Sequence, residues 1–466
     1  MILENARIFS EGLIHKGIIL IDGKIIKSLK FNPLNKETEE LIKINQDGKI
    51  IDCENRLILP GIIDIHSHLR DMEQIEKETF LTGTKAAAVS GVTTVFTMPN
   101  TKPPAITEKQ IKLWMRKASN NIYVDVGFIA GVPKKIDELE IKKIIDLGVI
   151  GFKIYPLKSL NDLDWTNDLN IQKILNISSK YQIPIFIHPD KSFYKKKWVE
   201  IYEDWSLKKY NTLELHDKLY PPKMELNYID FIIENLLKYI NENNISYEKY
   251  PIIHFCHIST KNSYDLLVNT INKYNKLKIS YEITPHHLLL SKMVKLSNQN
   301  FGLVLPPLRD VSHSKYLYNK FREGKITIIA TDHAPHTLEE KSNEYLMTPS
   351  GFPGFETYPL IILDKITQYE LALEFFVKSA SEIPALTFNL KNKGFIREGY
   401  DADLLIIEKI PKFTLDPKKF KTKAKYTPFE NFTTTIQIWK VFLGGIEIKS
   451  DEFSPQGIIL KRMKKI

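Results

Sequence analysis

The sequence predicts an α/β protein, a (β/α)8 TIM-like barrel with a small β-sandwich domain built from both termini. Two observations lead to this fold class: apolar runs alternate with helical spacers through the middle of the chain, and short β-like segments with turn residues occur at both ends. Near-continuous apolar strands that alternate with helices are typical of a parallel sheet buried on both faces. The length of 466 residues accommodates a large barrel with appendages.

The two ends of the chain are expected to share one small β domain, formed by residues 1–57 and 395–449. Near the amino end, Asp22-Gly23 separates two apolar runs, which is a hairpin signal. The carboxyl-terminal segment also consists of short apolar, β-like runs, and its turn residues include Gly444-Gly445. Residues 450–466 are expected to be a basic tail.

The barrel is expected to span residues 58–394. The residues that follow Pro189 are rich in Lys, Tyr and Trp, and we expect them to form helices over the barrel mouth. The eight barrel strands would be the apolar runs at residues 61–66, 92–97, 122–130, 149–155, 183–188, 251–257, 278–284 and 326–332.

Composition excludes several classes of protein. Cys53 and Cys256 are the only cysteines and cannot form a disulfide framework, so a reducing, cytoplasmic location is expected. No apolar stretch approaches the ~20 residues of a membrane span, and the amino end lacks the apolar region of a secretory signal. The net charge of +9 comes from scattered lysines with neighbouring acids, so we expect neither a membrane nor a nucleic acid as partner.

Polar residues fall at the ends of the predicted strands, and this placement is the main functional signal. Because the carboxyl ends of barrel strands form the active-site face, these side chains should converge. Residues two apart on a strand point to the same face, so the imidazoles of His66 and His68 can hold one metal ion. His254 should lie deeper in the barrel, as a core residue or a support for the ligands. The converging residues are His66, His68, Lys153, His188, His257 and Asp332.

Lys153 is unusual in this set because it lies inside an apolar strand, where an ammonium group is expensive to bury. Alternatively, Lys153 has a purely structural role, either as a cation paired with an anion or as a side chain whose charged end reaches solvent. Burial beside other cations lowers the pKa of a lysine and exposes the neutral amine, which reacts with carbon dioxide to form a carbamate. A carbamate can bridge two metal ions about 3.5–4 Å apart, the separation typical of two-metal hydrolases.

Seven motifs lie at or after the predicted strands: DIHSHLRD (64–71), TGTKAAAVSGVTTVFTMPNTKPP (82–104), GFKIY (151–155), HFCHIST (254–260), ITPHHLLL (283–290), PPLRD (306–310) and ATDHAPH (330–336). Together they resemble the cyclic amidohydrolases and, within them, the dihydroorotases. The terminal β segments, with GYDADLLIIE, extend the resemblance over nearly the whole chain. The combination of motifs is specific, whereas His-x-His-Leu-Arg alone would be a weak signal.

Carried onto this sequence position by position, the resemblance implies two zinc ions per chain. Carboxylated Lys153 and a hydroxide would bridge the two ions, and Asp332 would also transfer the proton during catalysis. The implied ligands are His66, His68 and Asp332 for one zinc, and His188 and His257 for the other.

The same resemblance implies a site for a substrate carboxylate at Arg70, Asn100 and His336. Hydantoinases and allantoinases act on rings without that carboxylate and lack the Arg and Asn as a class, so Arg70 and Asn100 are the discriminating residues. Weaker candidates for contact with the substrate ring are Leu305, Ser350 and Gly351.

The expected activity is the reversible, zinc-dependent hydrolysis of dihydroorotate to N-carbamoyl-aspartate, a step of de novo pyrimidine biosynthesis. Two alternatives stay open: another cyclic amidohydrolase, such as a hydantoinase, dihydropyrimidinase or allantoinase, and a non-catalytic relative that associates with aspartate transcarbamoylase. The expected partner is the small-molecule substrate, and the sequence decides neither a homodimer nor an association with aspartate transcarbamoylase.

Overall fold

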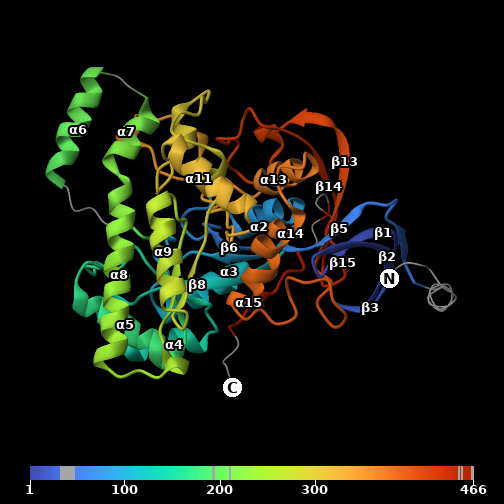
Figure 1. Cartoon of the computed structure of the whole chain (residues 1–466), viewed down its shortest axis with the longest axis horizontal. Coiled ribbons are helices and arrows are strands. Elements are labelled where there is room, and N and C mark those ends of the chain that lie inside the picture. Colours follow the sequence, from blue (N-terminus) through green and yellow to red (C-terminus); the bar gives the residue numbers. More distant parts are fainter. Residues whose placement is uncertain (32–47, 191–194, 209–210, 450–451, 453–454, 463–466) are drawn as a thin grey trace.

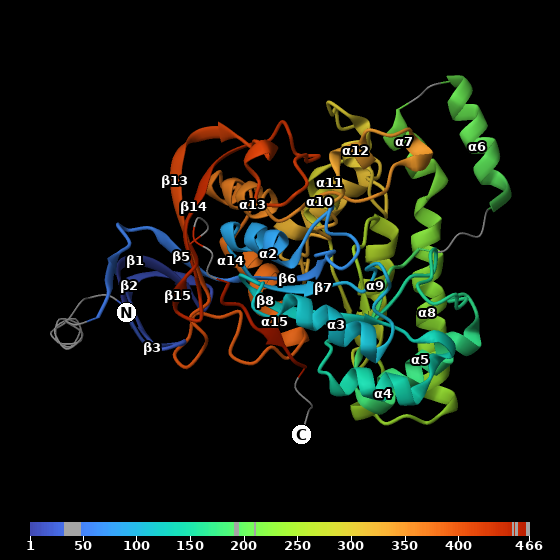
Figure 2. The ribbon, with the colours of Figure 1, turned by 180° about the vertical axis from the view of Figure 1, so that it is seen from behind.

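The structure is a computed structural model that describes residues 1–31, 48–190, 195–208, 211–449, 452 and 455–462. Within these residues the strands form two eight-stranded sheets, one in the barrel and one built from both chain ends. The two sheets lie side by side, and most helices surround the barrel (Figures 1 and 2). The remaining residues of the predicted basic tail, 450–451, 453–454 and 463–466, lie outside the described part of the chain.

The barrel sheet is parallel and runs in sequence order from β6 to β12. Each strand pairs with the next one along the chain, as successive βα units require. The strands are β6 (Ile62–Ser67), β7 (Val92–Thr97), β8 (Asp125–Gly131), β9 (Gly151–Ile154), β10 (Pro184–Ile187), β11 (Ile252–Phe255) and β12 (Lys278–Tyr281).

The eighth predicted strand closes the barrel through isolated bridges instead of a regular ladder. Ile329 pairs with Ile283, just beyond β12, and His333 pairs with Ser67 at the end of β6. The amide of His68 donates to the carbonyl of His333 at 2.7 Å. The predicted (β/α)8 barrel is therefore confirmed.

Helices surround the outside of the barrel (Figure 1). Their apolar side chains are buried in the main hydrophobic cluster together with those of the barrel strands. For example, α3 starts after Thr107, whose hydroxyl accepts from the amide of Gln110, and it buries Ile111 and Trp114. None of the helices in the described residues is long and apolar enough to cross a membrane. The helices between strands are α2 (Phe80–Val89), α3 (Glu108–Ala118), α4 (Glu138–Asp146), α5 (Asp168–Tyr181), α6 (Lys195–Lys208), α7 (Thr212–Leu219), α8 (Pro222–Glu242) and α9 (Lys261–Lys273). Those that follow β12 are α10 (Pro285–Leu289), α11 (Val311–Arg322), α12 (Leu338–Lys341), α13 (Tyr358–Thr367), α14 (Leu373–Val377) and α15 (Ile383–Thr387).

Apolar side chains fill the barrel interior. Phe388, just after α15, packs against Phe186 and His254 with ring centroids 5.3 and 5.4 Å apart. Phe186 and Phe388 belong to a buried apolar cluster that also includes Ile63 and Ile328 from other barrel strands. The barrel is therefore a packed core, and a ligand can be received only at its end.

The small β domain contains one sheet in the order β15-β14-β13-β5-β1-β2-β3, with β4 paired to β1. Its last amino-terminal strand, β5, leads through Gly61 directly into β6. A Cβ atom at Gly61 would lie 2.2 Å from the hydroxyl oxygen of Thr93, so the close approach of the two segments requires glycine. The strands are β1 (Ile2–Ser10), β2 (Leu13–Asp22), β3 (Ile25–Phe31), β4 (Ile50–Asp52), β5 (Leu57–Pro60), β13 (Leu404–Thr414), β14 (Thr433–Leu443) and β15 (Ile446–Glu447).

The described part of the predicted tail contains a short strand, β16 (Ile459–Leu460), which pairs in parallel with β8. The side chain of Asp125 on β8 accepts from the amide of Ile458 at 2.9 Å. Asp125 also pairs with Lys393 at 2.8 Å, and Lys393 pairs with Asp403 at 2.7 Å. Because Asp403 directly precedes β13, Lys393 connects the barrel, the tail and the β domain.

Candidate metal centre

A pocket opens at the carboxyl ends of the barrel strands. Five of the six predicted metal ligands line it, together with predicted substrate contacts from several loops. Its lining residues are His66, His68, Arg70, Asn100, Tyr155, His188, His257, Val304, Leu305, Asp332, Ala334, Ser350 and Gly351.

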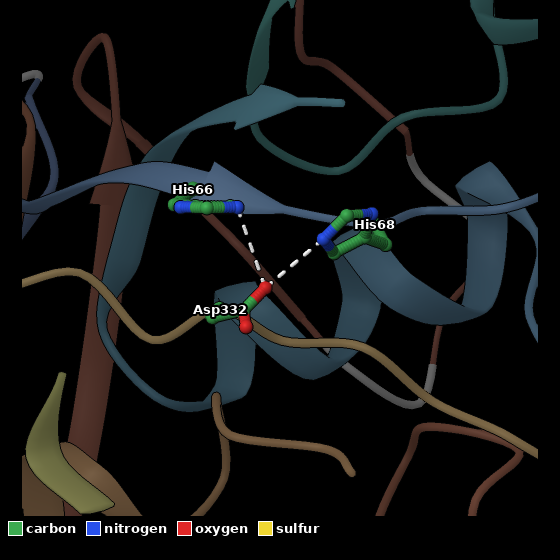
Figure 3. A group of neighbouring side chains, drawn as sticks. All are labelled: His66, His68 and Asp332. Carbon is green, nitrogen blue, oxygen red and sulfur yellow. Dashed lines mark hydrogen bonds and ion pairs between the residues drawn. The ribbon is translucent and has the colours of Figure 1, made fainter. Parts of the chain in front are cut away.

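Three of the predicted ligands form a compact group (Figure 3). Oδ1 of Asp332 lies 2.9 Å from Nε2 of His68 and 3.3 Å from Nε2 of His66. Asp332 has φ of 49°, which turns the chain after the closing segment and places the carboxylate between the two rings. A left-handed backbone at a residue other than glycine is a local strain of the kind that concentrates at functional sites.

The ring of His68 is held so that one nitrogen faces the carboxylate. Its Nδ1 donates to Oδ1 of Asn100 at 2.6 Å. Burial lowers the pKa of His68 to about 4 against the opposing effect of Asp332, so the ring is neutral near pH 7. Nε2 of His68 and Oδ1 of Asp332 face each other, so the two atoms are close enough to share one cation.

His188 and His257 follow β10 and β11 and face the same pocket. Their ring centroids lie 4.5 Å apart, and the ring of His257 lies 5.2 Å from that of His66. Burial and the nearby histidine His188 hold the pKa of His257 well below its usual range. Nδ1 of His257 is buried and has no hydrogen-bond partner among the described residues. A neutral imidazole with a free buried nitrogen is suited to metal binding.

Lys153 is the predicted ligand that does not line the pocket. It lies on β9 with 2% of its surface exposed, and its Nζ donates to Sγ of Cys256 at 2.7 Å. The ammonium also lies 5.3 Å from the ring centroid of Tyr155. The structure thus places Lys153 beneath the pocket, beside the residue that precedes His257.

Arg70 lines the pocket and contacts His336, a predicted substrate-binding residue that is not itself among the lining residues. Nη2 of Arg70 lies 3.2 Å from Nε2 of His336, and Nε donates to the carbonyl of Pro335 at 3.3 Å. Nε2 of His336 also lies 3.1 Å from the carbonyl oxygen of Ser350. The adjacent Gly351 has φ of 128°, and a Cβ atom there would lie 2.6 Å from the carbonyl oxygen of Ala334. This loop therefore requires glycine beside the pocket.

Sequence reasoning missed Glu282, which follows β12. Its carboxylate is fully buried and contacts Nδ1 of His66, and it accepts from the amide of His257 at 3.2 Å. Its second oxygen lies 3.1 Å from Nε2 of His254. The available signal was an acidic residue within the apolar run KISYEIT, the same kind of anomaly that identified Lys153. Tyr155, another pocket residue, was also missed.

Comparison with known proteins places this geometry in a family. The model of the amidohydrolase family matches residues 57–447. The chain belongs to the amidohydrolase family.

Its relatives include a dihydroorotase of Methanosphaera stadtmanae, 32% identical over 439 residues that cover 92% of each chain. A dihydroorotase of Pyrococcus abyssi is 32% identical and covers 97% of this chain and 95% of its own. Among solved amidohydrolase structures, the L-hydantoinase of Arthrobacter aurescens superposes with a TM-score of 0.83 at 21% identity, covering 99% of this chain and 97% of its own. The D-hydantoinase of a Thermus species gives 0.83 at 22% identity and covers 99% of both chains. The last two likenesses show the shared fold.

Members of the amidohydrolase family are generally metal-dependent, and the residues of this site fit a metal ion. Each member of the group His66, His68 and Asp332 offers one ligand atom, and these atoms lie within 4.8 Å of one another. Imidazole nitrogen and carboxylate oxygen are ligands that zinc accepts. The convergence of these three ligand atoms at the pocket is the observation that favours a bound cation.

Proposed function

We propose that the protein is a dihydroorotase, which hydrolyses dihydroorotate to N-carbamoyl-aspartate and closes the ring in the reverse, biosynthetic direction. The observation that carries the proposal is Arg70, a guanidinium buried at the wall of the pocket beside His336. A planar guanidinium is suited to bidentate binding of a carboxylate. Dihydroorotate carries such a carboxylate, whereas dihydrouracil and hydantoin do not. The dihydroorotase relatives support the same substrate.

We assign the metal ligands as the sequence predicts them. His66, His68 and Asp332 would hold one zinc ion, with His188 and His257 at the other. Lys153 would join the two as a carbamate, for which its Nζ must leave Sγ of Cys256. Bound zinc supplies Lewis acidity and lowers the pKa of water to about 7.

The protein's own groups would position the substrate and move the proton. Arg70 and His336 bind the substrate carboxylate and fix the ring. Burial opposes ionisation of Asp332, but His66 and His68 outweigh it and lower the pKa of this carboxyl, so Asp332 is ionised near pH 7. It can therefore accept a proton from the attacking water and deliver it to the leaving ring nitrogen, acting first as a base and then as an acid. Asn100 supports this arrangement by holding the ring of His68.

A four-substrate comparison tests the proposal. The purified protein is assayed with dihydroorotate, dihydrouracil, hydantoin and allantoin, before and after metal removal and with zinc restored. We expect zinc-dependent turnover of dihydroorotate alone. Preferred turnover of an uncharged ring would instead identify another cyclic amidohydrolase. A folded protein that binds no metal and turns over none of the four would identify a non-catalytic relative. The two buried free cysteines agree with the cytoplasm as the location of this reaction.

A further inference from the structure

Lys341, the last residue of α12, is a buried cation that has no part in the metal centre or in the proposed proton transfer. Its exposed fraction is 0%. Its Nζ donates to three main-chain carbonyl oxygens, those of Pro349 at 2.9 Å, Gly351 at 3.0 Å and Leu303 at 3.5 Å. Nζ also lies 5.7 Å from the ring centroid of Tyr426. Lys341 forms no ion pair within the described part of the chain, so neutral groups hold its amine.

The burial of this lysine is costly. Burial lowers the pKa of Lys341 to about 7, against the opposing effect of the neighbouring Glu340. A buried charge without an ion pair destabilises a protein unless its hydrogen bonds compensate for the lost water. A methionine would fill a similar volume without that cost. Stability of the fold alone therefore gives no reason for a lysine at this position.

The position of Lys341 is fixed by the chain around it. Its carbonyl oxygen accepts from Nδ2 of Asn298 and from Nδ2 of Asn300, each at 3.1 Å. At the other end of α12, Thr337 and Glu340 form a reciprocal capping box. The amine is therefore presented from a short helix that is held at both ends.

The three carbonyl groups that Lys341 binds belong to two segments, residues 303–305 and residues 349–351. Each segment contributes two of the residues that line the pocket, whereas Lys341 is not among the lining residues. The segments also meet directly, because the amide of Gly351 donates to the carbonyl of Leu303 at 2.8 Å. Lys341 therefore joins two walls of the pocket without lining it.

Ser350 connects this arrangement to the proposed carboxylate site. Lys341 binds the carbonyl groups on both sides of Ser350, at residues 349 and 351. The carbonyl oxygen of Ser350 itself lies 3.1 Å from Nε2 of His336. The same nitrogen lies 3.2 Å from Nη2 of Arg70. By fixing the peptide groups around Ser350, Lys341 also fixes the point at which His336 and Arg70 are supported.

We propose that Lys341 is a positioning residue for the substrate carboxylate. Its amine joins residues 303–305 to residues 349–351 and, through Ser350 and His336, holds Arg70 in place. Lys341 itself does not touch the substrate. The inference rests on the proposed function, because it concerns the site at which Arg70 and His336 would bind that carboxylate.

Kinetics of Lys341→Met test the proposal, because methionine keeps most of the side-chain volume and loses the donor. The matched control is Lys393→Met, which removes another buried lysine, one that pairs with Asp125 and does not line the pocket. Both variants are assayed as the zinc-loaded full chain, at a temperature at which they are folded. We expect KM for dihydroorotate to rise by roughly 10- to 100-fold in Lys341→Met with kcat within about threefold, since a misplaced binding group weakens ground state and transition state alike. Lys393→Met should leave both constants close to those of the unaltered protein.

A double-mutant cycle with Arg70→Lys separates positioning from a general structural effect. If Lys341 acts through Arg70, Lys341→Met should raise KM by less than about threefold when Arg70→Lys is already present. A full additive effect, an unchanged KM in folded Lys341→Met, or an equal rise in Lys393→Met would overturn the proposal. If Lys341→Met does not fold, Lys341→Gln, which is uncharged and shorter but still polar, is measured in the same way.

Hydrogen exchange separates this proposal from the proposed hydrolysis. The amide of Gly351 should exchange faster in Lys341→Met than in the unaltered protein or in Lys393→Met, because its segment has lost the amine of Lys341. Equal exchange in all three would overturn the proposal whichever substrate is hydrolysed. Faster exchange in Lys341→Met, combined with no turnover of dihydroorotate by the unaltered protein, would refute the proposed hydrolysis and the carboxylate role while supporting the connection between the two segments.

Discussion

Replacement of Arg70 by lysine should weaken the use of dihydroorotate while leaving the metal centre unchanged. Arg70 is 6% exposed, and its contacts with Pro335 and His336 engage Nε and Nη2. No hydrogen bond from Nη1 is found among the described residues, so this edge of the guanidinium is available to a substrate. The backbone at Arg70 has φ of 54°, and lysine adds no strain there because both side chains carry a Cβ.

The size of the effect follows from the hydrogen bonds that the lysine cannot make. Lysine keeps the positive charge but cannot offer the planar fork, so one charge-assisted hydrogen bond worth about 1.5–3 kcal/mol is lost. At about 1.36 kcal/mol per factor of ten, kcat/KM should fall by about 13- to 160-fold. Most of the loss should appear in KM, since the carboxylate is bound in both the ground state and the transition state.

Steady-state kinetics with dihydroorotate, together with the metal content of each preparation, measure this effect. Arg116→Lys is the matched control, because Arg116 is an exposed residue of α3 away from the pocket lining. The reasoning is refuted if Arg70→Lys changes kcat/KM by less than about threefold, a loss well below that of one charge-assisted hydrogen bond. A fall confined to kcat with unchanged KM would also contradict a role in binding the carboxylate.

Three further predictions concern the proton, the buried ion pairs and the response to pH. Asp332→Ala should reduce kcat by at least about 10²–10⁴-fold, because it removes the proton-transferring group, and near-normal turnover would contradict the mechanism. Lys393→Met should lower the free energy of unfolding by about 3–5 kcal/mol in chemical denaturation, because it leaves two buried aspartates uncompensated. The control is Lys391→Met at an exposed residue, which should change the free energy of unfolding little. Burial raises the pKa of Glu356 to about 7 from a reference of 4.5, against the opposing backbone hydrogen bonds from Thr422 and Lys421. The folded protein then binds the extra proton between these values, so the free energy of unfolding should fall as pH rises from about 4.5 to about 7, and Glu356→Gln should reduce that slope.

The barrel could be predicted from sequence because its strands are buried on both faces and read as continuous apolar runs. The eighth run was the least regular in the structure. Ile329 within this run and His333 just after it pair through isolated bridges, and the backbone turns away at Asp332. The pattern of apolar residues indicates that a segment is buried, but it carries no information on how many ladder hydrogen bonds the segment makes.

The two-residue strand β16 could not be predicted. It pairs with β8 from more than three hundred residues along the chain, and it is too short to show a periodic pattern. Its position depends on Asp125, which accepts from the amide of Ile458 and pairs with Lys393. Such contacts are set by the tertiary fold, and the basic composition of the segment predicts only a tail.

Placement of the candidate site residues followed from topology, whereas their contacts did not. Residues at the carboxyl ends of parallel strands must meet at one end of a barrel, which is why the sequence alone could place His66, His188 and His257 at one pocket. The convergence of strand ends does not predict which residues lie beneath the pocket. Glu282 lies inside an apolar run, and Cys256 is itself apolar in character. The sequence pattern therefore places both of them in the core.

Lys153 shows what this lower layer means for function. From sequence, its position suggested a group directed at two metal ions, but in the structure its amine is engaged with Cys256. A carbamate at Nζ would carry negative charge and could no longer donate that hydrogen bond as an ammonium. Modification of Lys153 would therefore release Cys256 and remove a positive charge that lowers the pKa values of His66 and His257, two of the predicted metal ligands.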